Sequence, residues 1–175
     1  MKKGIIIAVI LVALLIVGAG SCYVVQENQY ACTFRFSEIV NTTDQAGLHF
    51  KVPFLDSVKY FSKATQFYDI PPSEVLTSDK QNMTVDCYIL WSISDPKLFY
   101  QTLGSNSVAE QRLDALTYNE LKTVMGTLAQ ADIINMEDGA KRNEIYENIA
   151  ADVEALAKTY GLRVGDVKIK QFDLP

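Results

Sequence analysis

The N-terminus contains the longest uncharged apolar run of the chain. No charged residue occurs at positions 4–25, where Ile, Val, Leu and Ala dominate. A helix needs roughly 20 apolar residues to cross the hydrocarbon core of a bilayer. The run therefore predicts a transmembrane helix over residues 4–25, and the spanning residues include Gly4, Ile5, Leu11, Leu15 and Val25.

A cleaved signal is the alternative interpretation of this run. Secretory signals have an apolar core of only about 7–15 residues, which is shorter than the uncharged stretch found here. The sequence Ala-Gly-Ser-Cys at 19–22 faintly resembles a bacterial lipoprotein processing site, although Ala19 stands where such sites usually carry Leu. We expect an uncleaved anchor, and cleavage near Cys22 stays open as the alternative.

The distribution of charge predicts the orientation of the anchor. Lys2 and Lys3 precede the run, whereas residues 23–26 contain neither Lys nor Arg. Because the flank richer in Lys and Arg stays cytoplasmic, residues 1–3 are expected inside and the domain that starts at residue 26 outside. The outer part holds all 21 acidic residues and 14 of the 16 basic ones, a net charge of −7. Binding of nucleic acid is not expected, because it requires clustered Lys and Arg.

Residues 26–95 show the two-residue period of β-strands. A first candidate strand covers residues 30–36, and a second covers residues 83–93. The second has six apolar residues on one face, which predicts the central strand of a sheet. Pro71-Pro72 and residues 77–82 are expected to be loops. The apolar faces are Tyr30, Cys32, Phe34 and Phe36 in the first strand, and Met83, Val85, Cys87, Ile89, Trp91 and Ile93 in the second.

After Asp95-Pro96 the apolar residues recur at helical spacing. Ser107 and Glu110 fit a capping box at the start of a first helix, which is expected to end near Gly126. A second helix is expected to begin within residues 135–138, where acidic side chains suit the helix dipole. The apolar stripes, which we expect to be core, are Ala109, Leu113, Leu116, Leu121 and Val124 in the first helix, and Ile145, Ile149, Val153, Leu156 and Tyr160 in the second.

The order of these elements predicts an α+β domain over residues 26–175. Its first part, residues 26–95, is strand-rich, and its second part, residues 96–175, is expected to contain two helices and a final strand. Gly161 suits the left-handed residue that closes a helix. The apolar phase of the final strand changes at Gly165, which predicts a β-bulge there.

The chain lacks the residue patterns of common catalytic and metal sites. Its only His, His49, lies in a turn-then-strand context and is expected to be a satisfied or surface residue. One His and three scattered Cys do not have zinc-site spacing, and no phosphate-binding Gly-rich loop is present. Cys32 and Cys87 are expected to be buried thiols. We predict no enzyme activity, with no catalytic, cofactor-binding or metal-binding residues, and no small-molecule substrate. A hydrolase with carboxylates brought together by the fold is the weaker alternative.

Three motifs resemble the superfamily of stomatin, prohibitin, flotillin and HflK/HflC, known as the SPFH or band 7 superfamily. They are residues 46–58 (AGLHFKVPFLDSV), residues 83–96 (MTVDCYILWSISDP) and the ending at 161–175, which closes on IKQFDLP. Within this superfamily the chain resembles the HflC-like protease modulators. The likeness covers the whole chain and implies an SPFH domain.

This resemblance implies a non-catalytic scaffold in the bacterial inner membrane. HflC-like proteins pair with HflK-like paralogues in large hetero-oligomers around an FtsH-like membrane AAA protease and regulate which substrates reach it. Family members continue into a long helical segment, so the chain that stops at Pro175 is expected to be an N-terminal fragment. A stomatin- or prohibitin-like organiser of membrane microdomains, without a protease partner, is the alternative. The predicted outer location favours the HflC-like role.

A short segment after the anchor predicts contact with the membrane surface. Its apolar residues are too closely spaced for strict alternation to bury all of them. One interpretation is a hairpin edge that dips into the outer leaflet, where aromatic groups are favoured; the other is burial of both faces in the domain. The residues concerned are Leu48, Phe50, Val52, Pro53, Phe54 and Leu55.

Overall fold

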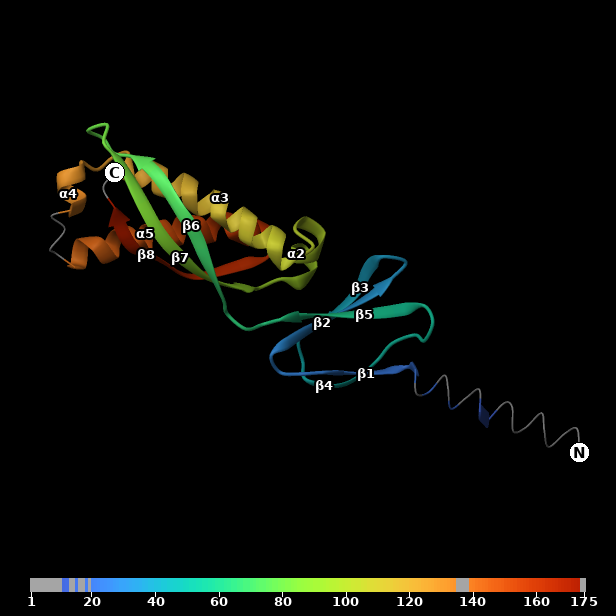
Figure 1. The fold of residues 1–175 in the computed structure, drawn as a ribbon. Coiled ribbons are helices and arrows are strands. Elements are labelled where there is room, and N and C mark those ends of the chain that lie inside the picture. The colour runs from blue at the N-terminus through green and yellow to red at the C-terminus, as the bar shows by residue number, and fades with distance from the viewer. Residues whose placement is uncertain (1–10, 13–14, 16–17, 19, 135–138, 174–175) are drawn as a thin grey trace, which may run out of the picture. The chain divides into compact units, whose positions relative to one another are not determined.

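The computed structural model describes residues 11–12, 15, 18, 20–134 and 139–173 (Figure 1). They form two compact units, the first ending at Lys63 and the second beginning at Ala64. The predicted α+β class is confirmed, with strands first and helices later. The predicted division after residue 95 is not where the units part, because the strands on either side of residues 77–81 belong to one sheet with the final strand.

The described residues of the first unit form five antiparallel strands. Strands β1 (Cys22–Val25) and β4 (Gly47–Phe50) form a two-stranded sheet. Strand β2 (Gln29–Arg35) is central in a three-stranded sheet, between β3 (Glu38–Thr43) and β5 (Asp56–Ser62).

Strand β2 buries both of its faces. Four consecutive residues, 31–34, are buried, and Ala31 packs in one cluster with Tyr23 and Val25 of β1. The single apolar face expected for this strand is therefore wrong. Phe36 does not belong to the strand at all, since it lies in the following turn with 84% of its surface exposed.

The end of the predicted membrane span needs correction at Val25. Residues 22–25 are strand β1, and Val25 is 1% exposed within the first unit. Leu11 and Leu15 are helical and exposed, whereas Gly4 and Ile5 lie outside the described residues. Within the part of the chain that the structure describes, no helix is both long enough and apolar enough to span a bilayer.

The second unit is one antiparallel sheet covered by helices. Strand β7 (Asn82–Ile93) lies between β6 (Gln66–Leu76) and β8 (Leu162–Asp173). Helix α3 (Asn106–Met125) packs on β6, and α5 (Gly139–Ala157) packs on both β8 and α3 (Figure 1). The described residues of this unit also form three short helices: α2 (Pro96–Thr102), α4 (Gln130–Ile134) and the 3-10 helix η1 (Lys158–Tyr160).

Strand β7 confirms the predicted central strand. Its burial alternates along its whole length, and all six residues of the expected apolar face are buried. Leu90 pairs with Asp166 and Trp91 with Val164, so Gly165 is the extra residue of a bulge, as expected. Residues 77–81 form a loop, but Pro71-Pro72 forms a bulge inside β6 rather than a loop.

The first long helix begins differently from the capping-box prediction. Its N-cap is Ser105, whose hydroxyl accepts a hydrogen bond from the Val108 N–H at 3.4 Å. Its C-cap is Gly126, in agreement with the sequence. The residues buried against the sheet follow a four-residue step, Ala109, Leu113, Thr117, Leu121 and Met125. Gly161 is left-handed, with φ of 75°, as predicted. The expected start of the second helix at 135–138 lies outside the described residues.

Candidate membrane-contact surface

The apolar residues predicted to meet the membrane remain exposed in the first unit. Leu48 and Phe50 belong to β4, and residues 52–55 form the loop between β4 and β5. Phe50 is 75% exposed and Phe54 89% exposed. The alternative interpretation, burial of both faces within the domain, is therefore wrong for this segment. Leu48, Val52 and Leu55 are also exposed, and Pro53 is half-buried.

Asp56 holds the 52–55 loop closed. Its backbone N–H donates to the Val52 carbonyl at 3.0 Å, and its Oδ2 accepts from the Val52 N–H at 2.9 Å. This reciprocal pair of hydrogen bonds leaves Phe54 at the turn in a left-handed conformation, with φ of 66°. Left-handed backbone is costly for a residue with a bulky side chain. The loop is therefore held in a shape that presents Phe54 outward.

Arg35 fixes the same carboxylate from the neighbouring strand. Its Nε donates to Asp56 Oδ1 at 2.8 Å and its Nη2 to Asp56 Oδ2 at 3.1 Å, the two-pronged geometry of a strong Arg–carboxylate pair. The Asp56 side chain is 4% exposed. The hydrogen bonds from Arg35, followed by that from the Val52 N–H, lower the pKa of Asp56 below its ordinary value. The same contact raises the pKa of Arg35.

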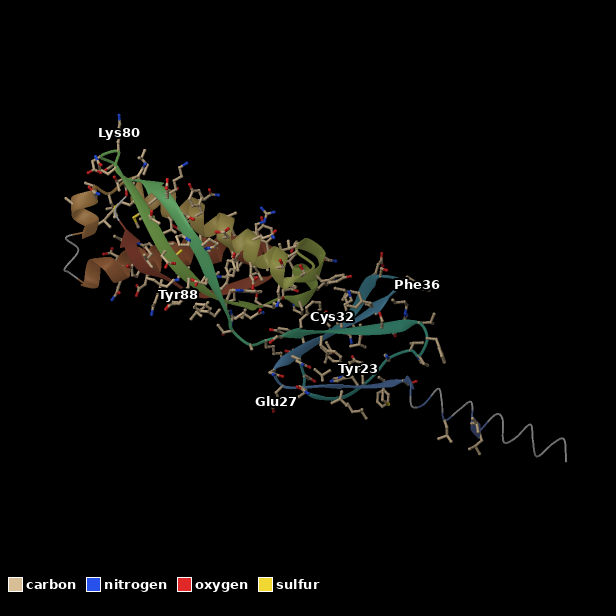
Figure 2. The ribbon with its side chains drawn as sticks, in the orientation of Figure 1. Tyr23, Glu27, Cys32, Phe36, Lys80 and Tyr88 are labelled. Carbon is tan, nitrogen blue, oxygen red and sulfur yellow. The ribbon has the colours of Figure 1, made fainter. Side chains whose placement is uncertain are left out.

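A second outward-facing Phe lies beside this ion pair. Arg35 and Glu38 are paired across β2 and β3, so Phe36 and Ser37 form a two-residue hairpin turn. Both turn residues have positive φ, 50° and 71°, as hairpin turns of type I′ require. Figure 2 shows Phe36 at the tip of this hairpin. Sequence reasoning placed it inside a strand, because the usual turn signal, Asn or Asp followed by Gly, is absent here.

A groove of about 440 Å³ lies among strands β2 and β3 and the segment 50–56. Its walls combine apolar side chains with charged ones, and it is open to solvent. Arg35 and Lys51 contribute positive charge to it. The lining residues are Thr33, Arg35, Val40, Asn41, Phe50, Lys51, Val52 and Asp56.

The two units differ sharply in charge. Residues 20–63 carry four acidic and four basic side chains, so this part of the first unit is neutral. Residues 64–175 carry 17 acidic and 10 basic side chains, a net charge of −7. A neutral unit with exposed apolar groups can approach an anionic lipid surface without the electrostatic cost that the acidic unit would incur.

The side chain of His49 contacts two residues of the first unit. Its Nε2 lies 2.9 Å from the Gln45 carbonyl, and its ring centroid lies 5.6 Å from that of Tyr23. The prediction of a satisfied His is confirmed. Cys32 and Cys87 are buried thiols that form no disulfide, also as predicted. Among the described residues, no three His, Cys, Asp or Glu side chains cluster in a way that could hold a metal ion.

Comparison with known families identifies the domain. The family model described as "SPFH domain / Band 7 family" matches residues 23–175. The chain belongs to this family. The SPFH match begins at Tyr23, within β1, and so includes the candidate membrane-contact surface as well as the acidic second unit.

Among relatives of this SPFH chain are several proteins called HflC. The Modulator of FtsH protease HflC of Escherichia coli K12 is 28% identical over 218 aligned positions, which cover 100% of this chain and 65% of the relative. Protein HflC of Haemophilus influenzae is 28% identical over 163 positions, 89% of this chain and 55% of the relative. Protein HflC of Treponema pallidum is 29% identical over 135 positions, 77% of this chain and 41% of the relative. The chain thus spans less than two thirds of the length of these relatives.

Proposed function

We propose that this SPFH chain is part of a membrane-anchored, non-catalytic scaffold that regulates the access of substrates to an FtsH-like membrane AAA protease. The observation that carries this proposal is the similarity to HflC over the whole chain, since the Escherichia coli relative is called a modulator of FtsH protease. The relatives' names describe modulation and not catalysis. An HflK-like paralogue is the proposed partner in a hetero-oligomer.

The proposed location is the bacterial inner membrane, with residues 1–3 in the cytoplasm and the SPFH domain on the outer face. The uncharged run at 4–25 supports a single membrane anchor, which would end before the start of β1 at Cys22. The exposed apolar residues of the 48–55 segment support a second contact, in which the first unit rests in the outer leaflet. The full transfer of a large apolar side chain out of water is favourable by about 1.5–3 kcal/mol of free energy. Phe50 and Phe54 would therefore add substantially to a single helical anchor.

The proposed mechanism is control of access. A scaffold whose first unit lies against the bilayer leaves little room for a membrane substrate to pass beneath it. Many copies side by side would then restrict lateral approach to the enclosed protease. No bond-making step is required of the scaffold, and the role rests on placement of the domain at the lipid surface.

The test uses the full-length gene product, tagged and extracted from the native membrane in mild detergent. Its native mass and the proteins that co-purify are recorded. The proposal predicts a very large particle that contains an HflK-like protein and the AAA protease. A small homo-oligomer with lipid but without protease would contradict it and would favour an organiser of membrane microdomains. An unrelated single-span membrane protein with the same tag controls for non-specific co-purification.

A further inference from the structure

The groove in the first unit has unused cationic hydrogen-bonding capacity. Arg35 has five N–H donors, and the two bonds to Asp56 occupy its Nε and one Nη2 hydrogen. Three donors of this guanidinium are left without a partner among the described residues. The side chain is 39% exposed, so these donors can be reached by a ligand. The geometry suits an oxyanion that approaches the outer edge of a guanidinium already fixed in place.

Lys51 supplies a second cation on the same groove. It follows β4 directly, and its backbone N–H donates to the Ser21 carbonyl at 2.7 Å, which fixes the start of its side chain. Within the described part of the chain, the Lys51 amine forms no ion pair. Its charge nevertheless acts on Asp56, where it contributes to the lowered pKa of that carboxyl group. Lys51 is thus close to the Arg35–Asp56 pair and has its own charge available.

The remaining walls of the groove are apolar. Val40, Phe50 and Val52 line it beside the two cations. Phe50 and Val52 are exposed and belong to the same segment as the exposed Phe54. A free inorganic anion would gain nothing from such walls, whereas a molecule with a phosphate at one end and hydrocarbon at the other would use both kinds of surface. The groove volume of about 440 Å³ is of the size that small-molecule sites have.

We propose that this groove binds the headgroup of an anionic phospholipid, with the phosphate held by Arg35 and Lys51 and the glycerol and first acyl carbons against Val40, Phe50 and Val52. The inference rests on the membrane contact proposed above and adds a lipid preference to it. Arg binds phosphate through paired N–H donors, and Lys contributes a mobile point charge. Asp56 remains occupied by Arg35 and Val52, so its negative charge is largely compensated.

Glu38 weakens the preference of this site for anions. It pairs with Arg35 across the hairpin and is exposed, without an ion pair to Arg35 in the described structure. Its carboxylate opposes the binding of any anion nearby. The formal charges of Arg35, Lys51, Asp56 and Glu38 sum to zero, so an anion is attracted only locally, by Lys51 and by the outer edge of Arg35 that does not bond Asp56. We expect moderate preference for anionic headgroups and not tight binding.

The experiment compares lipid retention by variants of the full chain in a neutral detergent. Equal amounts of phosphatidylglycerol and phosphatidylcholine are added, and native mass spectrometry counts each lipid on the protein. The wild type should retain phosphatidylglycerol about five- to tenfold more than phosphatidylcholine, because both lipids carry the phosphate but only phosphatidylcholine adds a quaternary ammonium cation, which Arg35 and Lys51 repel. Lys51→Gln should abolish most of this preference, and Lys51→Arg should restore it. Lys59→Gln, which removes a charge of the same unit that does not line the groove, should retain the preference.

Three outcomes would overturn the assignment. Equal retention of the two lipids by the wild type would remove the headgroup preference. Equal loss in Lys59→Gln and Lys51→Gln would show general charge attraction instead of a site. Displacement of phosphatidylglycerol by an equal concentration of inorganic phosphate would identify free phosphate as the ligand. The co-purification of the protease is measured separately on the wild type, so failure of the lipid site and failure of the proposed modulator role are distinguishable.

Discussion

Arg35 and Asp56 join the two turns that present the most exposed aromatic side chains of the first unit. Arg35 is the last residue of β2 and Asp56 the first of β5, and they are register partners linked by hydrogen bonds of 2.8 and 3.1 Å. Phe36 follows Arg35 directly, and Phe54 lies two residues before Asp56. One ion pair therefore positions both Phe side chains, which are 84% and 89% exposed.

Asp56→Asn should loosen the 52–55 loop at neutral pH. The folded-state pKa of Asp56 is lowered by Arg35 and Val52, so its stabilising effect is present above the unfolded value of about 3.9 and is lost as pH falls through the folded-state pKa. Faster hydrogen exchange of the 52–56 amides is therefore expected in the variant at pH 7, with the difference from wild type shrinking below about pH 4. Asp44→Asn, at an exposed residue of the same unit, is the control. Equal exchange in wild type and Asp56→Asn at pH 7 would contradict the role given to Asp56.

Gly161→Ala should destabilise the second unit strongly. Gly161 has φ of +75°, and a Cβ at this position would clash with the Asp95 carbonyl oxygen and would lie 2.8 Å from the Phe99 nitrogen. We expect a loss of about 2–4 kcal/mol in the free energy of unfolding, from the backbone strain and the clash together. Denaturant unfolding followed by the fluorescence of Trp91, the single Trp, measures it. Gly165→Ala is the matched control, since its Cβ meets nothing closer than 3.6 Å, and a similar loss in both variants would refute the explanation.

Thr117→Val should leave the stability of the second unit unchanged or raise it slightly. Thr117 is fully buried on α3, and its Oγ1 has no hydrogen-bond partner among the described residues. Removal of an unsatisfied buried hydroxyl should change the free energy of unfolding by less than about 1 kcal/mol. Thr77→Val is the comparison, because the Thr77 hydroxyl donates to Asp79 and accepts from the Gln81 N–H. It should cost about 1–3 kcal/mol. A larger loss for Thr117→Val than for Thr77→Val would show that the Thr117 hydroxyl has a partner in the folded protein.

Cys87 should resist alkylation in the folded chain. Burial is the main cause that raises the pKa of this thiol to about 12, with a smaller contribution from Asp86. The reactive thiolate is therefore nearly absent at pH 8 to 9. Iodoacetamide treatment followed by peptide mass spectrometry should find Cys87 unmodified in the native protein and fully modified after unfolding. Ready modification of Cys87 in the folded protein at pH 8, which rises only about threefold by pH 9 as for a thiol with a pKa near 8.5, would indicate an ordinary, accessible thiol.

The sequence predicted the fold best for strands that bury one face, because the buried face fixes which residues point into the core. Residues 83–93 place an apolar side chain at every second position, and only a strand with one buried face satisfies that period. The phase change at Gly165 could be recognised for the same reason, since a bulge shifts every later side chain to the other face. Gly161 was predictable because only Gly adopts the left-handed conformation without cost.

The features that the sequence did not reveal depend on contacts between distant segments. Ser105 and Ser107 are both suitable N-caps, and only the packed helix selects Ser105. The burial of both faces of β2 comes from β1, which lies in the segment read as membrane helix. The turn at Phe36-Ser37 contains neither Gly nor Asn, so local preference gave no signal. The Arg35–Asp56 pair joins residues 21 positions apart, and no spacing rule anticipates it.

The most direct test of the account is whether Phe54 enters the lipid. The full chain with Phe54→Trp is reconstituted into bilayers that contain brominated lipids, which quench Trp fluorescence on contact, and the emission of buried Trp91 is subtracted with the wild type as reference. Phe67→Trp is the control, since Phe67 is 61% exposed but belongs to the second unit. We predict strong quenching of the Trp at position 54 and little at position 67. Emission from position 54 that is unaffected by the brominated lipids would contradict the membrane-contact surface.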